Sequence, residues 1–543
     1  MARTAAFRSF ARLMTAALLA DRRHLSANDA LGSLEELAAT RSSRLISRRR
    51  FLAEAAAIGT TLAFGTLFPR EPAAAKATTP TLSVGIVGAG LAGLACADVL
   101  KTRGIRASIY EAGTRPGGRC WSLRGFFPGQ VAERGGELID TLHTTMLGYA
   151  KRFGLALQDL HKESGEIFYY FSGQRYTEAA VVTEFRNFVS VIRNDLHRLS
   201  REVSATDHTP EDVALDQISL LAYLDGQNGA RIAAGPVARA AIIAAYEGEY
   251  GLAASEQSCL NFLLFIHPDR RSTFTPFGVF SDERYHLVDG NDRIIEGLTN
   301  EFPGQVDYGR KLLRVHRLSD GRIELTFQPD RAKIHDIVVL AIPFTVLREV
   351  ELDASLAIPA DQLAVIHGLG YGTNAKMMVG FSGRPWQALG GNGTTYANLT
   401  NLQTTWETNP SLASSARGIL TDYSSGPRAL GLDTTKIQLE AGRFLDDLNF
   451  VYPGAREAAT HENRKVLVHL EHWPSNPLVK GSYTCYRPGQ LTTMVGLEGV
   501  PVGNLFFAGE HTNSFYEWQG FMEGAARSGI AAARSILATI QRR

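Results

Sequence analysis

A glycine-rich loop near residue 90 constrains the fold of this chain more than any other feature. It has the pattern Gly-x-Gly-x-x-Gly at 88–93, between an apolar, β-branched stretch at 82–87 and an apolar helical segment at 91–103. The first glycine permits a tight turn, the second lets the backbone approach a pyrophosphate, and the third lets the helix pack on its strand. A second strand at 107–110 ends at Glu111, an acid suited to a ribose diol. This βαβ unit predicts an α/β fold with a dinucleotide site.

A second glycine-containing stretch lies more than four hundred residues downstream. Leu505-Phe-Phe-Ala-Gly-Glu-His-Thr512 is typical of a strand followed by a Gly-Glu turn, and an alanine-rich helix is expected over 521–540. An NAD site would need only the first loop, whereas a second cofactor-binding segment at 505–525 suits a larger anionic cofactor. The pair of motifs therefore predicts FAD and redox chemistry.

Length, charge and cysteine content exclude several classes of protein. With 543 residues the chain is too long for one hydrophobic core, so two or three domains are expected. Lys plus Arg (56) nearly balance Asp plus Glu (55), which argues against a nucleic-acid partner. The four cysteines have neither Cys-x-x-Cys nor metal-ligand spacing, so we expect no metal.

The N-terminal region resembles a Tat export signal. Ser-Arg-Arg-Arg-Phe-Leu at 47–52 precedes an apolar run at 55–68 and a small-residue stretch at 73–77. We therefore expect residues 1–77 to be an export leader and linker, and the protein to be periplasmic or secreted; a basic, disordered tail is the alternative. The apolar run is too short for a stable membrane span.

Hydrophobic periodicity predicts the remaining elements. Apolar residues recur at helical spacing through about 175–280, and 312–327 is typical of a strand pair around a turn. Further strands are expected at 334–342, 376–381 and 466–471.

Together these motifs resemble the flavin monoamine oxidase family over roughly residues 82–540. The resemblance rests on 84–119, Glu133-Arg-Gly-Gly-Glu137, 336–343, Lys376, 473–483 and 505–525. It implies an α/β fold, in which a Rossmann-type FAD-binding domain of the amine oxidase kind is interleaved with a mixed-sheet plus helical substrate domain. The implied FAD-binding segments are 82–145, 285–345 and 498–543. The implied substrate-binding segments are 146–284 and 346–497, with a helical insert near 175–280.

The glycine motif and the resemblance assign a set of residues to noncovalent FAD. They are Gly88, Ala89, Gly90, Leu91, Ala92, Glu111, Ala112, Gly118, Arg119, Gly135, Gly136, Glu137, Leu138, Leu312, Trp473, Gly509, Glu510, Phe521, Met522 and Ala525. The resemblance implies that Leu312 meets adenine, that Glu510 lies in the ribityl-phosphate region, and that the 521–522 amides meet the flavin pyrimidine edge. Family members with covalent flavin have cysteine where this chain has Ser482, which excludes a thioether there.

The resemblance also implies three catalytic residues. Lys376 would hydrogen-bond a water at flavin N5, and Tyr483 and Phe521 would form two aromatic walls around the substrate amine. The plain alternatives are a solvent-facing lysine and two core aromatics. Trp518 is a further candidate for lining the site. His511, beside Glu510, is expected to pack or to hydrogen-bond rather than to catalyse.

The substrate is expected to be an amine. Amino-acid oxidases of the family grip the substrate carboxylate with an arginine where this chain has Glu137 and Leu138, although Arg284 could replace it. Glu137 or Asp140 could attract an ammonium, and the acidic-aromatic cluster 246–250 could line an entrance or be a solvated helix end.

The predicted reaction takes hydride from the α-carbon of the amine to flavin N5. Reoxidation by O2 gives H2O2, and the imine hydrolyses to aldehyde and ammonia. The alternatives are an L-amino-acid oxidase, a desaturase or oxidase of the same fold acting on other substrates, and a nucleotide-binding protein without turnover. Both a monomer and a homodimer remain open.

Overall fold

The computed structural model describes most of the chain from residue 82 onward. The described residues are 16–17, 19–21, 25–31, 82–160, 165–200, 202–266, 283–329, 331–409, 417–513 and 518–541. The export-signal motif at 47–52 and the apolar run after it lie outside these residues.

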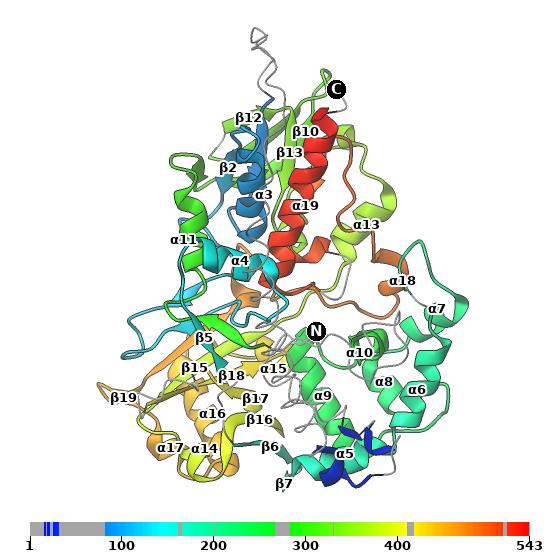
Figure 1. Ribbon diagram of the computed structural model, residues 1–543, viewed down its shortest axis with the longest axis vertical. Helices are drawn as coiled ribbons and strands as arrows, with labels where there is room; N and C mark the ends of the chain where they lie inside the picture. Colours follow the sequence, from blue (N-terminus) through cyan, green and yellow to red (C-terminus); the bar gives the residue numbers. More distant parts are fainter. Residues whose placement is uncertain are drawn as a thin grey trace, which may run out of the picture.

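The upper part of the molecule in Figure 1 is built on a five-stranded parallel sheet. In spatial order its strands are β22 (Leu505–Phe507), β13 (Ile337–Leu340), β1 (Val84–Val87), β2 (Ser108–Glu111) and β9 (Val306–Tyr308). The strands β1 and β13 are buried throughout, as expected for a parallel sheet covered on both faces.

The N-terminal and C-terminal glycine-containing motifs both adjoin this sheet. Strand β13 lies between β1 and β22, and helix α3 (Leu91–Lys101) packs against the terminal helix α19 (Met522–Gln541), as Figure 1 shows. The packing is close at Gly529, where a Cβ would lie 2.0 Å from the carbonyl oxygen of Ala92. The two distant glycine-containing motifs therefore lie beside the same parallel sheet.

One predicted strand, 334–342, divides between two sheets. The first part is β12 (Arg331–His335), which belongs to a four-stranded sheet, and the second is β13 in the parallel sheet. The change occurs at Asp336, whose carboxylate accepts hydrogen bonds from the amide and hydroxyl of Ser83 at 2.8 and 2.9 Å. The four-stranded sheet consists of β12, β11 (Ile323–Gln328), β10 (Lys311–Arg317) and β14 (Glu351–Leu352).

A mixed seven-stranded sheet forms the second part. In spatial order its strands are β21 (Val468–His472), β15 (Ala375–Phe381), β18 (Gly418–Ser424), β17 (Leu402–Glu407), β16 (Gly391–Leu399), β6 (Glu166–Phe171) and β7 (Gln174–Tyr176). Met377, Val379 and Phe381 of β15 pack in one cluster with α16 (Ile437–Val451). Because side chains alternate along a strand, Lys376 and Met378 point to the opposite face.

A helical layer adjoins this sheet at the lower right of Figure 1. Its members are α5 (Glu178–Arg186), α6 (Val189–Arg198), α7 (Pro210–Asp216), α8 (Leu220–Leu224), α9 (Pro236–Tyr250) and α10 (Cys259–Ile266). The cluster 246–250 ends α9, and its two tyrosines and Glu249 are buried, so the expectation of a solvated helix end was wrong. Part of the expected leader also packs here, since Asp21 pairs with Arg193 at 2.8 Å and the Leu25 carbonyl accepts from Arg186 at 2.6 Å.

The remaining elements connect these layers. They are β3 (Ser122–Leu123), β4 (Ala132–Glu133), α4 (Thr144–Arg152), β5 (Leu157–Asp159), β8 (Tyr285–Leu287), α11 (Arg293–Asn300), α12 (Phe344–Leu347), α13 (Ala360–Gly368), α14 (Pro385–Ala388), α15 (Gly426–Leu430), α17 (Ala455–Ala458), β19 (His461–Glu462), β20 (Lys465–Val466) and α18 (Leu491–Met494), with short 3₁₀ turns at 354–356, 473–475 and 510–512. Among the described residues, no helix combines the length and apolarity that crossing a bilayer requires.

Candidate active site

The turn between β1 and α3 is shaped by its glycines. Gly88 has φ +103°, and a Cβ there would lie 2.5 Å from the carbonyl oxygen of Ala341. A Cβ at Gly93 would lie 2.0 Å from the carbonyl oxygen of Gly88. Helix α3 begins after Gly90, which has no side chain to cap it, so its first amides are left for another acceptor.

Glu111 ends β2 beside this turn. One carboxylate oxygen accepts from the amide of Ala89 at 2.9 Å, and the other accepts from the amide of Gly113 at 2.7 Å. These contacts hold the carboxylate at the cavity wall, and each oxygen keeps capacity for another donor.

An ion pair joins the two ends of the sequence. Arg119 donates to Glu510 at 3.0 Å and also to the carbonyl oxygen of Ser482. Glu510 further accepts from the hydroxyl of Thr484 at 3.2 Å and the amide of Gly520 at 2.8 Å. Burial alone would raise the pKa of Glu510, but the attraction of Arg119 holds it below its usual range. Glu510 is therefore an ionised, buried residue that holds Arg119, Thr484 and Gly520 together.

A cavity of about 630 Å³ extends from this turn to the seven-stranded sheet, a volume in the range of small-molecule sites. Of the residues assigned from sequence to cofactor and catalysis, all except Ala89 line it. Two further candidates, Arg284 and Trp518, do not line the cavity. Arg284 instead pairs with Asp159 at 2.8 Å, and Trp518 packs beside His143 with a ring-centroid distance of 5.9 Å.

The sheet end of the cavity is an aromatic surface. Lys376 on β15 lies directly across from Tyr423 on β18, and Trp406 on β17 lies on the same face. The Trp406 and Tyr423 rings meet edge to face at 5.0 Å, and the Tyr423 and Tyr483 hydroxyls are 3.0 Å apart. We call this part of the cavity, with Glu137, Leu138 and Phe521, the reacting half.

Lys376 is held by protein atoms. Its ammonium donates to the carbonyl oxygens of Glu133 at 3.2 Å and Gly135 at 2.8 Å, and to Oε2 of Glu137 at 2.7 Å. An ammonium has three donors, so these contacts use all of them and none is left in this arrangement for the expected water. The alternative of a solvent-facing lysine is also wrong, because only 4% of the residue is exposed.

The same pair corrects the expected role of the acidic residues. Glu137 is neutralised by Lys376 and accepts from the indole of Trp406 at 3.1 Å. Asp140 is buried outside the cavity lining and lies 3.3 Å from His143. Neither carboxylate is therefore available to attract a substrate ammonium.

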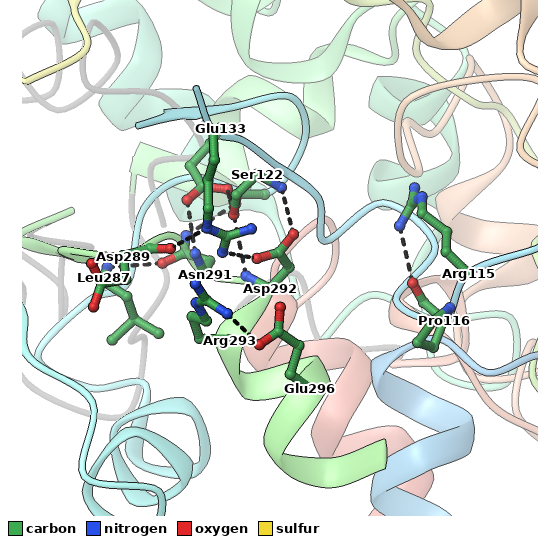
Figure 2. Close-up of polar contacts among 12 residues, drawn as sticks. Arg115, Pro116, Ser122, Glu133, Leu287, Asp289, Asn291, Asp292, Arg293 and Glu296 are labelled. Carbon is green, nitrogen blue, oxygen red and sulfur yellow. Dashed lines mark hydrogen bonds and ion pairs between the residues drawn. The ribbon is translucent and has the colours of Figure 1, made fainter. Parts of the chain in front are cut away.

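A buried polar cluster supports the loop that carries Gly135 and Gly136. Figure 2 shows Glu133 between Ser122 and Asn291; its carboxylate accepts from the Ser122 hydroxyl and the Asn291 amide, both at 2.8 Å. The side chain of Asn291 donates in turn to the carbonyl oxygens of Gly136 and Glu137 at 3.1 and 2.7 Å. Burial raises the pKa of Glu133 to about 8.

Three lining residues were missed or incompletely described from the sequence. Trp406 and Tyr423 lie on strands that hydrophobic periodicity did not predict, because 402–407 and 418–424 are buried on both faces and show no regular alternation of polar and apolar residues. His511 packs edge to face on Phe344 with a ring-centroid distance of 4.3 Å, and burial lowers its pKa to about 4.

Comparison with known proteins defines the family. Residues 91–537 match the profile of the flavin containing amine oxidoreductases. The chain belongs to this family. An L-amino-acid oxidase of Pseudechis australis is 21% identical over 472 residues, which cover 83% of this chain and 86% of that protein.

Solved structures show the same fold. Putrescine oxidase bound to putrescine has a TM-score of 0.69 at 21% identity, covering 84% of this chain and 100% of that one. Cyclohexylamine oxidase from Brevibacterium oxydans has a TM-score of 0.72 at 19% identity, covering 85% and 100%. The predicted family, the amine-oxidase fold class and the assignment as a flavin amine oxidoreductase are confirmed.

The residues of the cavity fit the flavin nucleotide that the family carries. Gly90 and Gly118 line it side by side; a Cβ at Gly90 would meet no other part of the described chain within 4 Å, and one at Gly118 would first meet Gly90 at 4.0 Å. Side chains there would fill the space over the uncapped start of α3. Neither ring nitrogen of His511 has a hydrogen-bond partner within the described part of the chain, although the residue is buried in the cavity wall. A bound ligand can satisfy such a group.

Proposed function

We propose that this flavoprotein is an FAD-dependent amine oxidase. The overall reaction converts a primary amine, O2 and water into an aldehyde, ammonia and H2O2. The observation that carries the proposal is the reacting half, where aromatic walls stand beside a lysine already neutralised by Glu137. FAD, when bound, supplies the two-electron chemistry.

The chain's own residues bind, orient and exclude water. The uncapped start of α3 and the Gly90–Gly118 turn suit the pyrophosphate, and Glu111 suits the ribose. Tyr483 and Phe521 flank the position proposed for the amine. No described carboxylate in the reacting half is left without a cation, because Glu137 is paired with Lys376, so a substrate ammonium would lose its proton to water on entry and react as the neutral amine.

Oxidation of L-amino acids is the second candidate. It is favoured by the sequence similarity to proteins named L-amino-acid oxidases. Against it, no arginine among the described residues lines the reacting half, so a substrate carboxylate would lack a bidentate partner.

Anaerobic reduction separates the two candidates. The FAD-loaded enzyme is mixed with primary amines or with L-amino acids, and bleaching of the flavin absorbance is followed. Rapid bleaching by amines is expected; bleaching by amino acids alone would transfer the proposal to the second candidate.

We further propose that FAD is held noncovalently. The residue at the position of the family's flavin-linking cysteine is Ser482, whose hydroxyl donates to Asn374 at 2.5 Å. Acid precipitation should leave the flavin in the supernatant, and a yellow pellet would contradict noncovalent binding.

We also propose export by the Tat route, on the twin-arginine pattern at 47–52. Secreted or periplasmic protein should begin after residue 77. Recovery of exported protein that retains Met1 would refute the leader, whereas the contacts of Asp21 and Leu25 would then persist in the mature enzyme.

A further inference from the structure

We infer that Glu137 determines the charge of the substrate. By neutralising Lys376 it makes the reacting half uncharged, so the substrate class is a monoamine with an uncharged, apolar body. This inference rests on the proposed function and narrows it to exclude diamines and amino acids.

The two oxygens of Glu137 have separate partners. Oε2 lies 2.7 Å from the ammonium of Lys376, and Oε1 accepts from the indole of Trp406 at 3.1 Å. Both charged residues line the cavity, yet Glu137 is 7% and Lys376 4% exposed. The interaction of a pair so far removed from water is weakly screened, and loss of either partner leaves the other uncompensated.

The surface beside the pair is suited to an apolar substrate. The Trp406 indole nitrogen is occupied by Glu137, and the Tyr423 and Tyr483 hydroxyls face each other. The Tyr483 hydroxyl also lies 3.3 Å from the carbonyl oxygen of Gly248. With these polar atoms turned to protein partners, the rings and Leu138 are what the wall presents to a substrate.

No other described carboxylate lining the cavity can receive a second ammonium. Glu111 lies beside the β1–α3 turn, at the end of the cavity away from the reacting half, and Glu510 is paired with Arg119. A diamine would therefore place its distal ammonium in the reacting half without a counter-ion, and an amino acid would do the same with its carboxylate. Burial of either unpaired charge is unfavourable.

A second site on the same strand provides a matched control. Glu407, the residue after Trp406, is also buried and also combines a cation, Arg384, with an indole, Trp386, whose nitrogen donates at 2.8 Å. Glu407 faces the other side of the sheet and does not line the cavity. Glu407→Gln therefore removes the same kind of carboxylate without changing the charge of the reacting half.

Three aromatic probes of similar size test the charge directly. Benzoate is an anion, benzamidine a cation and benzyl alcohol neutral, and none of them is an amine that the reaction would consume. Their dissociation constants are measured by titration calorimetry with the FAD-loaded enzyme. The wild type is expected to bind benzyl alcohol better than either ion.

Each single variant should change the preference in its own direction. Glu137→Gln leaves Lys376 uncompensated and should tighten benzoate at least about tenfold relative to benzyl alcohol. Lys376→Met leaves Glu137 uncompensated and should tighten benzamidine by a similar factor. The double variant has neither charge, so it should return to the wild-type preference, and Glu407→Gln should keep it throughout.

The outcomes are decisive even if one variant does not fold, because the other single variant carries the opposite sign. Unchanged preferences in a folded single variant, or a double variant that still prefers one ion, would overturn the role of Glu137. In turnover, benzylamine should reduce the wild-type flavin and putrescine should not. If no amine reduces it, the proposed function itself fails; if putrescine reduces it as fast, only this inference fails.

Discussion

The buried carboxyl of Glu133 makes the stability of this protein depend on pH in an unusual direction. Burial raises its pKa to about 8 in the fold, against about 4.5 in the unfolded chain. Between these values the folded state binds a proton that the unfolded state releases, so raising the pH favours unfolding. The contribution is fully present below about pH 4.5 and is lost as the pH rises through about 8.

The perturbation is Glu133→Gln, which has the same shape and cannot ionise. Its side-chain oxygen can accept from the Asn291 amide, and its amide can donate to the Ser122 hydroxyl, so both contacts in Figure 2 are retained. At about 1.4 kcal/mol for each pH unit, the wild type is expected to be less stable than the variant by about 1 kcal/mol at pH 5 and about 4 kcal/mol at pH 8.

The assay is urea unfolding of both proteins across this pH range, with the difference in unfolding free energy as the result. Glu296→Gln is the control, because it removes an exposed carboxylate of the same region, paired with Arg293 at 2.5 Å. Its curve should follow the wild type. If the Glu133→Gln and wild-type curves stay parallel between pH 5 and pH 8, Glu133 is ionised in the fold and the reasoning is wrong.

Three further predictions concern the part of the cavity lined by the β1–α3 turn, Arg119, Glu510 and His511, which we call the cofactor half. Gly88→Ala should weaken FAD binding at least about tenfold, because φ +103° and the carbonyl oxygen of Ala341 leave no room for a Cβ. The fraction of FAD that stays with the protein on gel filtration measures this loss. A variant that retains all of its FAD would show that glycine is not needed at this position. Arg119→Ala leaves Glu510 buried without its cation and should cost about 3 to 5 kcal/mol in urea unfolding, whereas a loss under about 1 kcal/mol would show that Glu510 takes up a proton easily. His511 has a pKa of about 4 in the fold, so between pH 6.5 and pH 4 it stays neutral while the unfolded chain takes up a proton. The free energy of unfolding should therefore fall by about 3 kcal/mol as the pH is lowered from 6.5 to 4. His511→Phe should remove this fall, and a variant that loses the same stability over this pH range would contradict the argument.

The cofactor half was predictable because its signals are local. The glycine spacing at 88–93 and the acid eighteen residues later follow from the geometry of one βαβ unit, in which turn, helix start and strand end are set by neighbours in sequence. The Gly-Glu turn at 509–510 and the helix after it carry similar local information. Almost every residue assigned there lines the cavity.

The reacting half was predictable only in part. Lys376 was identified, but its partner was not, because Glu137 lies 239 positions earlier and joins it across two layers of the fold. Trp406 and Tyr423 were missed since their strands are buried on both faces, which hides the alternation of polar and apolar residues.

The sequence by itself predicted a dinucleotide site and placed the chain among the flavin amine oxidoreductases, because the backbone turns that hold phosphates need particular residues at particular spacings. Only the tertiary structure decided the charge of the reacting half. A carboxylate and an ammonium far apart in sequence cancel each other only when folding brings them to 2.7 Å, and whether that happens depends on the register of β15 and on the loop that Glu133 and Asn291 hold in place.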